Sequence, residues 1–157
     1  MKSNQNNKNK HIKTILYSLQ NEKLHIEKIF SHDYFMGVAM VRNNKLAGRL
    51  EDIKFLQSYE PNTRQNFLKE AKVLSAMQHD NIPKVYDIVE QEDMLLFRSE
   101  HIEGYSMKEV LDALKEQNKE FPRACAASII LKLMNALYYA HKEVIYERKK
   151  RSIVHGD

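Results

Sequence analysis

Residues 66–111, NFLKEAKVLSAMQHDNIPKVYDIVEQEDMLLFRSEHIEGYSMKEVL, decide how the rest of this sequence is interpreted. The stretch opens with apolar residues at helical spacing and then changes to two strand-like runs, residues 82–90 and 94–102, separated by the acidic turn QED. The residues expected to share one helical stripe are Phe67, Val73, Leu74 and Met77. The helix is expected to begin after Pro61-Asn62-Thr63, which has the residue types of a turn and cap.

The flanking segments extend this pattern on both sides. Alternating or short apolar runs at residues 24–30, 37–41 and 49–56 predict three strands joined by short turns, which favours an antiparallel meander. After residue 105, an amphipathic segment at 106–118 and a long apolar segment at 121–143 predict two helices, with Ser106 as the cap of the first. The sequence therefore predicts an α+β protein.

Composition narrows the classes of protein that fit. The chain has 157 residues, of which 43% are apolar and 29% charged, with a formal net charge of +4; these values are typical of a folded domain. The excess positive charge lies in residues 1–10 and 147–151 without interleaved aromatic side chains, so we expect solvated surface and no nucleic-acid binding. The polar residues at the start favour a disordered or short helical extension over residues 1–23.

Several special sites are not expected. The single cysteine, Cys125, excludes an internal disulfide and is expected to be an inert core residue of the long helix. The seven histidines lack short ligand spacings, so no metal site is expected. The most apolar stretch, residues 124–140, is interrupted by Lys132 and Asn135 and is shorter than the ~20 residues of a spanning helix. We expect no membrane span and a cytoplasmic location.

Three motifs in this order resemble the protein kinase family, and the longest match is the opening stretch. The family's His-x-Asn-Ile pattern is found at residues 79–82, and Glu70 lies nine residues before His79. The stretch SEHIEGYSM, residues 99–107, is similar to the kinase hinge. Residues 153–157, IVHGD, look like the start of the catalytic loop, with Gly156 in place of the usual arginine. The insert before this loop is similar to that of some bacterial Ser/Thr kinases.

The resemblance implies a kinase N-lobe and hinge over residues 24–103 and part of a C-lobe over residues 104–157. The N-lobe would be a five-stranded antiparallel sheet with one helix, and the partial C-lobe would contribute two helices and the start of the catalytic loop. The complete form would use ATP and Mg²⁺ to phosphorylate hydroxyl groups of a protein substrate.

The resemblance also assigns roles to individual residues. Lys54 would hold the ATP phosphates and Glu70 would orient it, while Asp157 would be the catalytic base. Glu100 and Ile102 would present backbone groups to adenine, and Ser99 would lie behind the adenine pocket. Gly37 and Ala39 would belong to the nucleotide-binding loop and the strand that follows it.

The glycine-rich loop departs from the family pattern. Of its three glycines only Gly37 is present, and His32 and Tyr34 stand at the other two positions. Bulky side chains there hinder the approach of backbone N–H groups to phosphate. Asp52 replaces a small residue two positions before Lys54, which adds a desolvation cost and a repulsive neighbour for ATP. Ala39 stands at the usual valine position.

The end of the chain leaves alternatives open. The kinase motifs that follow the catalytic aspartate are not among these 157 residues, so this chain alone is expected not to transfer phosphate. The apolar helix is expected to expose Ile129, Ile130, Leu133, Met134 and Leu137 unless something covers it. A truncated product, a piece of a longer polypeptide, or a covering partner would each account for that. The main alternative function is a pseudokinase-like interaction module that has lost ATP binding; an RNA- or lipid-binding peptide fused to a small domain is remote.

Overall fold

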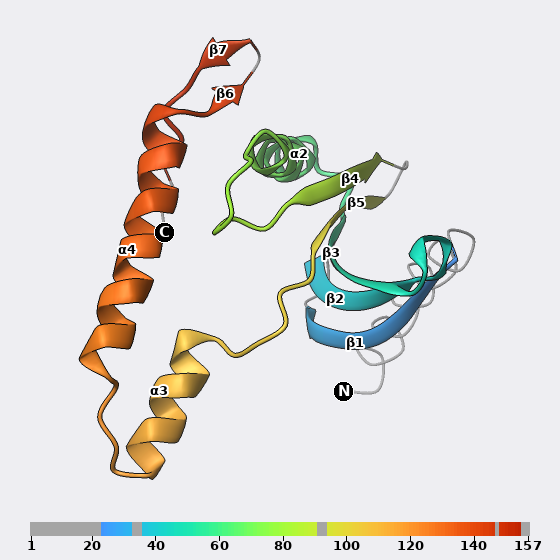
Figure 1. Ribbon diagram of the computed structural model, residues 1–157. Helices are drawn as coiled ribbons and strands as arrows, with labels where there is room; N and C mark the ends of the chain where they lie inside the picture. The colour runs from blue at the N-terminus through green and yellow to red at the C-terminus, as the bar shows by residue number, and fades with distance from the viewer. Residues whose placement is uncertain (1–22, 33–35, 91–93, 147, 155–157) are drawn as a thin grey trace. The chain divides into compact units, whose positions relative to one another are not determined.

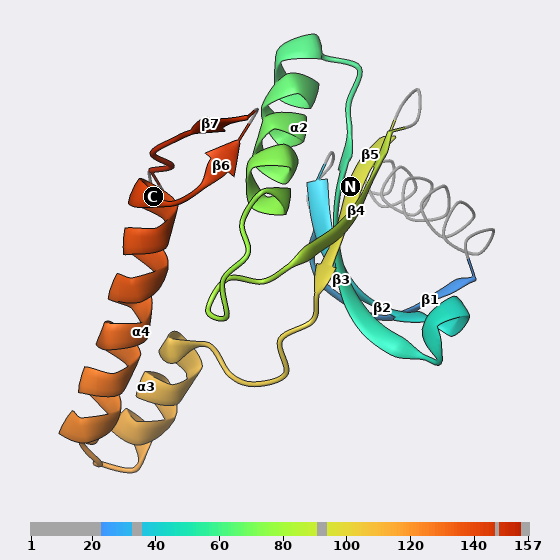
Figure 2. The same ribbon diagram turned by 45° about the horizontal axis from the view of Figure 1, so that its top comes forward.

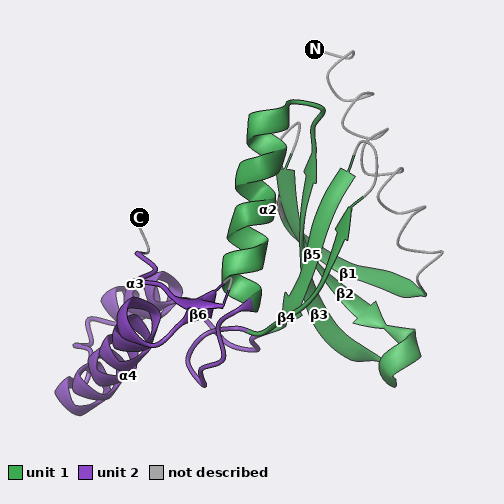
Figure 3. Ribbon diagram, turned by 90° about the horizontal axis from the view of Figure 1, so that it is seen from above, with its two compact units in different colours: residues 1–75, 84–101 green, residues 76–83, 102–157 purple. Residues whose placement is uncertain are grey.

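The computed structural model describes residues 23–32, 36–90, 94–146 and 148–154. It divides into two compact units, residues 1–75 with 84–101 and residues 76–83 with 102–157 (Figure 3). The extension expected over residues 1–23 lies outside the described residues, apart from Lys23.

The first unit is built on a five-stranded sheet in the order β1-β2-β3-β5-β4 (Figure 1). The antiparallel meander consists of β1 (Leu24–His32), β2 (Met36–Asn43) and β3 (Arg49–Gln57), with the 3-10 turn η1 (Asn44–Leu46) between the last two. The antiparallel pair β4 (Val85–Glu90) and β5 (Met94–Glu100) joins the sheet through β5, which pairs with β3. The predicted α+β fold and its five-stranded sheet are confirmed.

Helix α2 (Pro61–Ser75) lies against one face of this sheet (Figure 2). Its Phe67 and Ala71 are buried with the side chains of Leu56, Leu95 and Phe97. The rings of Phe67 and Phe97 lie 5.4 Å apart between centroids, within the range of a favourable aromatic pair. Of the stripe predicted for this helix, Phe67 is buried in this core and Leu74 packs against it, whereas Val73 and Met77 are not among the described residues of this core. The buried Ala71 was not predicted.

The opposite face of the sheet carries a second core. Its buried members, which alternate along the strands with the residues that face α2, are Leu24, Ala39, Val41, Ile53, Phe55, Met94 and Leu96. Because successive side chains of a strand point to opposite faces, these residues lie across the sheet from Lys54. This division determines which side chains can contribute to the candidate site.

The second unit contains the two predicted helices, α3 (Met107–Glu116) and α4 (Arg123–Lys142), and a short hairpin of β6 (Ile145–Tyr146) and β7 (Lys149–Lys150). Ser106 caps α3 as expected: its hydroxyl accepts a hydrogen bond from the backbone N–H of Glu109, whose carboxylate accepts one from the Ser106 N–H. The hairpin was not predicted, because its strands are too short to show a period.

Two expectations for α4 have different outcomes. Cys125 is exposed, so its prediction as a core residue is wrong; the helix buries Ala136 and Ala140 instead. Its exposed large apolar side chains are Ile130, Leu131, Leu133, Met134, Leu137 and Tyr138. Four of the five residues expected at an uncovered surface are thus exposed, while Ile129 is half-buried.

Candidate functional site

An ion pair joins β3 to α2 within the first unit. Lys54 Nζ lies 2.6 Å from Glu70 Oε1, and the two side chains retain 28% and 45% exposure. The lysine nitrogen is also 6.0 Å from the ring centroids of Phe67 and of Phe97. A partly exposed pair adds about 1 kcal/mol or less to stability. The main consequence of the pair is therefore positional, because it holds the Lys54 ammonium group near the rings of Phe67 and Phe97.

The local sequence explains why these two groups meet. Lys54 shares its sheet face with Leu56, which packs under α2, so the strand directs the lysine toward the helix. Glu70 precedes the buried Ala71 and follows Phe67 by three residues, which places it at the edge of the packed stripe. The juxtaposition expected from the resemblance is the one the structure shows.

The β2–β3 register corrects the expectation for Ala39. Ala39 pairs with Ile53 and is 1% exposed within the core on the far face, so its side chain cannot join Lys54. The residue opposite Lys54 is Val38, and the residue opposite Asp52 is Met40; both are half-buried. The sequence assignment placed Ala39 by its spacing from Gly37 in the loop. In the observed register, each β2 side chain lies on the face of the sheet opposite to the one that this assignment implies.

Gly37 is present for a packing reason. It pairs with Phe55, and a Cβ added to it would lie 2.3 Å from Phe55 Cζ. The position lacks a side chain because the aromatic ring fills that space. The structure does not associate Gly37 with the face that carries Lys54.

Asp52 lies on the same face as Lys54 and has a partner. His101 Nδ1 is 2.9 Å from Asp52 Oδ1, and both side chains are half-buried. Sequence reasoning identified Asp52 as an unfavourable charge but did not identify His101, because the contact joins residues 49 positions apart. The sequence did contain one relevant signal, the strand period of two, which places Asp52 and Lys54 on one face of the sheet.

The remaining expected site residues are distributed differently. The Glu100 N–H donates to the Lys84 carbonyl oxygen at 2.8 Å, and the Glu100 carboxylate accepts from the Lys84 N–H. Ile102 belongs to the second unit and is exposed. Asp157 and Tyr34 lie outside the described residues, as does the side chain of His32.

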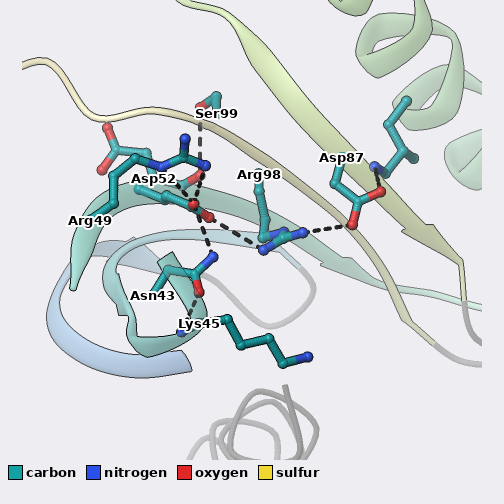
Figure 4. Close-up of polar contacts among 9 residues, drawn as sticks. Asn43, Lys45, Arg49, Asp52, Asp87, Arg98 and Ser99 are labelled. Atoms are coloured by element: carbon teal, nitrogen blue, oxygen red, sulfur yellow. Dashed lines mark hydrogen bonds and ion pairs between the residues drawn. The ribbon is translucent and has the colours of Figure 1, made fainter. Parts of the chain in front are cut away.

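A polar network on the far face of the sheet was missed by the sequence analysis (Figure 4). Its centre is Glu51, which is fully buried. Oε1 of this carboxylate accepts hydrogen bonds from Asn43 and Arg49, and Oε2 accepts one from Arg98 at 3.4 Å. Arg98 also donates to Asp87 at 2.8 Å, so the network ties four strands together close to where β5 ends.

Within residues 23–32, 36–90, 94–146 and 148–154, three or more histidine, cysteine or acidic side chains do not gather as a metal site would require. None of the helices in these ranges has the length and apolar character needed to cross a membrane.

Comparison with known proteins gives consistent matches. Residues 36–154 match the model of the protein kinase domain. Over 81 residues the chain is 30% identical to Serine/threonine-protein kinase ICK of Rattus norvegicus, covering 52% of this chain and 12% of that protein. Over 84 residues it is 30% identical to Serine/threonine-protein kinase PrkC of Bacillus subtilis (strain 168), covering 54% and 12%. The matched part of this chain thus corresponds to a small fraction of the length of each of these relatives.

Proposed function

The chain belongs to the protein kinase family, and we propose that it forms the nucleotide-binding part of a Ser/Thr protein kinase. The observation that carries the proposal is the Lys54–Glu70 ion pair, formed between a sheet strand and the helix packed on it. In the complete form, ATP with Mg²⁺ supplies the phosphoryl group that is transferred to a protein hydroxyl.

The residues of the Lys54 face fit part of a nucleoside triphosphate. The ammonium group of Lys54 is partly exposed and held by a carboxylate, which suits a cation that must stay in place beside phosphate oxygens. Val38 and Met40 offer half-buried apolar surface on the same face, suited to a purine ring. The described residues offer no ligand set for Mg²⁺, so no role in metal binding is assigned to them.

Each residue of the pair has a distinct task in this proposal. Lys54 binds the α- and β-phosphates and neutralises part of their charge. Glu70 accepts a hydrogen bond from Lys54 Nζ and so restricts the ammonium to one position. Without Glu70 the flexible side chain of Lys54 samples several rotamers, and binding the phosphates then costs the conformational entropy of restricting it to one of them.

A second candidate function is a pseudokinase-like interaction module that does not bind ATP. The observations that favour it are the occupation of the space at Gly37 by Phe55 and the carboxylate of Asp52 on the Lys54 face. Both weaken the expected contacts to a nucleotide, and neither affects the fold.

Thermal unfolding with and without Mg-ATP separates the two functions. Nucleotide that binds the folded chain raises Tm, by an amount that corresponds to about 2.7 kcal/mol at a hundredfold excess over Kd. We expect Lys54→Met to abolish this shift and Glu70→Gln to reduce it. Lys69→Met, which changes an exposed lysine next to Glu70 in α2, is the matched control and should retain the shift. A full shift in Lys54→Met removes Lys54 from the site, and no shift in the unaltered chain favours the interaction module.

A further inference from the structure

Asp52 and His101 form a second pair beside the Lys54–Glu70 ion pair. The His101 Nδ1–Asp52 Oδ1 distance is 2.9 Å, and the two side chains are 15% and 26% exposed. Asp52 precedes Lys54 by two residues in β3, so the two side chains project from the same face, roughly 7 Å apart along the strand. The Asp52 carboxylate therefore belongs to the surface proposed to receive the nucleotide.

A lone carboxylate at this place opposes a nucleoside triphosphate, because both are negative and the site is partly shielded from water. His101 can remove that opposition. With a protonated imidazole the pair has no net charge, and with a neutral imidazole it keeps the negative charge of Asp52. Histidine is the side chain that ordinarily changes its charge between pH 5 and 8.

Among the described side chains around Asp52, His101 is the one placed to offset its charge. On the same face, Lys54 is engaged with Glu70. From β2 the uncharged Met40 faces Asp52, and from β5 the Ser99 hydroxyl donates to the Asp52 backbone carbonyl at 3.5 Å.

The other charged side chains of this region lie on the far face or have partners elsewhere. Arg98 and Glu51 contact each other on the far face, and Glu100 pairs with Glu51 in the strand register and accepts from the Lys84 N–H. Within the part of the chain that the structure describes, His101 is thus the basic side chain in contact with Asp52.

We propose that His101 is a positioning residue for the nucleotide site, because it offsets the charge of Asp52 and so allows a nucleoside triphosphate to bind beside this carboxylate. Binding is tightest when the Asp52–His101 pair carries its extra proton. This inference rests on the nucleotide-binding function proposed above and adds a proton-dependent regulation of the same site. Acidification then strengthens nucleotide binding, and rising pH weakens it.

Calorimetric titration of the 157-residue chain with Mg-ATP at about pH 6 and about pH 8 tests the inference. We expect the Kd of the unaltered chain to rise roughly tenfold between the two, a typical size for such coupling. Asp52→Asn removes the carboxylate while His101 can still gain a proton, so at the higher pH it should bind as tightly as the unaltered chain does at the lower one, and at the lower pH no less tightly. His101→Gln keeps a hydrogen-bond donor without a titratable charge and should bind at both as weakly as the unaltered chain does at the higher one.

Two further variants complete the design. The double variant Asp52→Asn, His101→Gln carries neither charge and should bind at both pH values as tightly as the unaltered chain does at the lower one, so the loss caused by His101→Gln disappears when Asp52 is also replaced. His25→Gln changes an exposed histidine of β1 and should keep the pH dependence of the unaltered chain. If His101→Gln fails to fold, the comparison of the double variant with the unaltered chain still tests the inference, and it also subtracts any titration of the nucleotide itself.

The outcomes separate this inference from the function on which it rests. Equal pH dependence in the double variant and in the unaltered chain overturns the role of the pair while leaving nucleotide binding in place. Failure of every variant to bind Mg-ATP, Asp52→Asn included, overturns the proposed function and the inference with it.

Discussion

At the scale of single residues, Gly37 shows how a motif glycine can have a packing role. A methyl group at this position would lie 2.3 Å from Phe55 Cζ, closer than non-bonded carbon atoms can approach. We expect Gly37→Ala to lower the free energy of unfolding by about 1–3 kcal/mol, the usual range for an overpacked core. Urea denaturation monitored by circular dichroism measures the loss.

The partner in this contact provides the control. In a Phe55→Leu background the ring atoms that meet the new methyl group are gone, so the cost of Gly37→Ala should fall. If the cost is the same in both backgrounds, the ring contact is not the reason for the glycine.

Site residues could be predicted where sequence motifs identify their positions in the fold. The Lys54–Glu70 contact was expected from the resemblance to the protein kinase family, supported by the interval from Glu70 to His79. The Glu51 network and the Asp52–His101 pair were not, since each depends on which residues face one another across strands distant in the sequence. The displaced expectation for Ala39 has the same origin: one step of register exchanges the two faces.

At the scale of elements, the start of α2 depends on one carboxylate. Glu60 accepts hydrogen bonds from the side chain of Thr63 and from the backbone N–H groups of Thr63 and Asn62, and these lower its pKa from the ordinary value of 4.5. They satisfy N–H groups that a helix start otherwise leaves without partners. Because the pKa is lower in the folded chain, this stabilisation is fully present above pH 4.5 and is lost as the pH falls through the folded-state pKa.

Substitution of this cap has a defined pH signature. We expect Glu60→Gln to lower Tm by a few degrees at neutral pH and by progressively less as the pH falls below 4.5. Differential scanning calorimetry across that range measures both effects, and Glu103→Gln, which alters an exposed loop glutamate, should leave Tm unchanged. A Tm difference that persists undiminished in strong acid means that the charge of Glu60 is not its cause.

Element types were easier to predict than element ends. The types of strands β1 to β5 and of helices α2 to α4 agree with the apolar runs and periods in the sequence. The strand predicted over residues 82–90 begins only at Val85, because the preceding turn hydrogen-bonds the N–H groups of Asn81 and Ile82 to His79. Such turns are stabilised by local hydrogen bonds that leave no hydrophobic period in the sequence.

At the scale of the whole chain, exposed apolar surface on α4 is the feature with a measurable consequence. Leu131 and Met134 are each 61% exposed and lie three residues apart on the helix, with Tyr138 one turn further along and equally exposed. Large clusters of this kind bind hydrophobic probes, because covering apolar area releases about 25 cal/mol per Å². We expect the native chain to enhance the fluorescence of the dye ANS strongly, without the loss of packing seen in molten states.

A double substitution tests whether α4 is the source of that signal. Leu131→Lys with Met134→Lys should lower ANS fluorescence severalfold while preserving the helical circular dichroism, since both side chains are exposed and lysine is a good helix former. Ile29→Lys, at an exposed apolar position of β1, is a control outside α4 and should have a smaller effect. Because the Mg-ATP shift is proposed to depend on Lys54 in the first unit, it should be the same with and without the two lysines on α4. An ANS signal that survives both substitutions on α4 would place the dye-binding surface elsewhere.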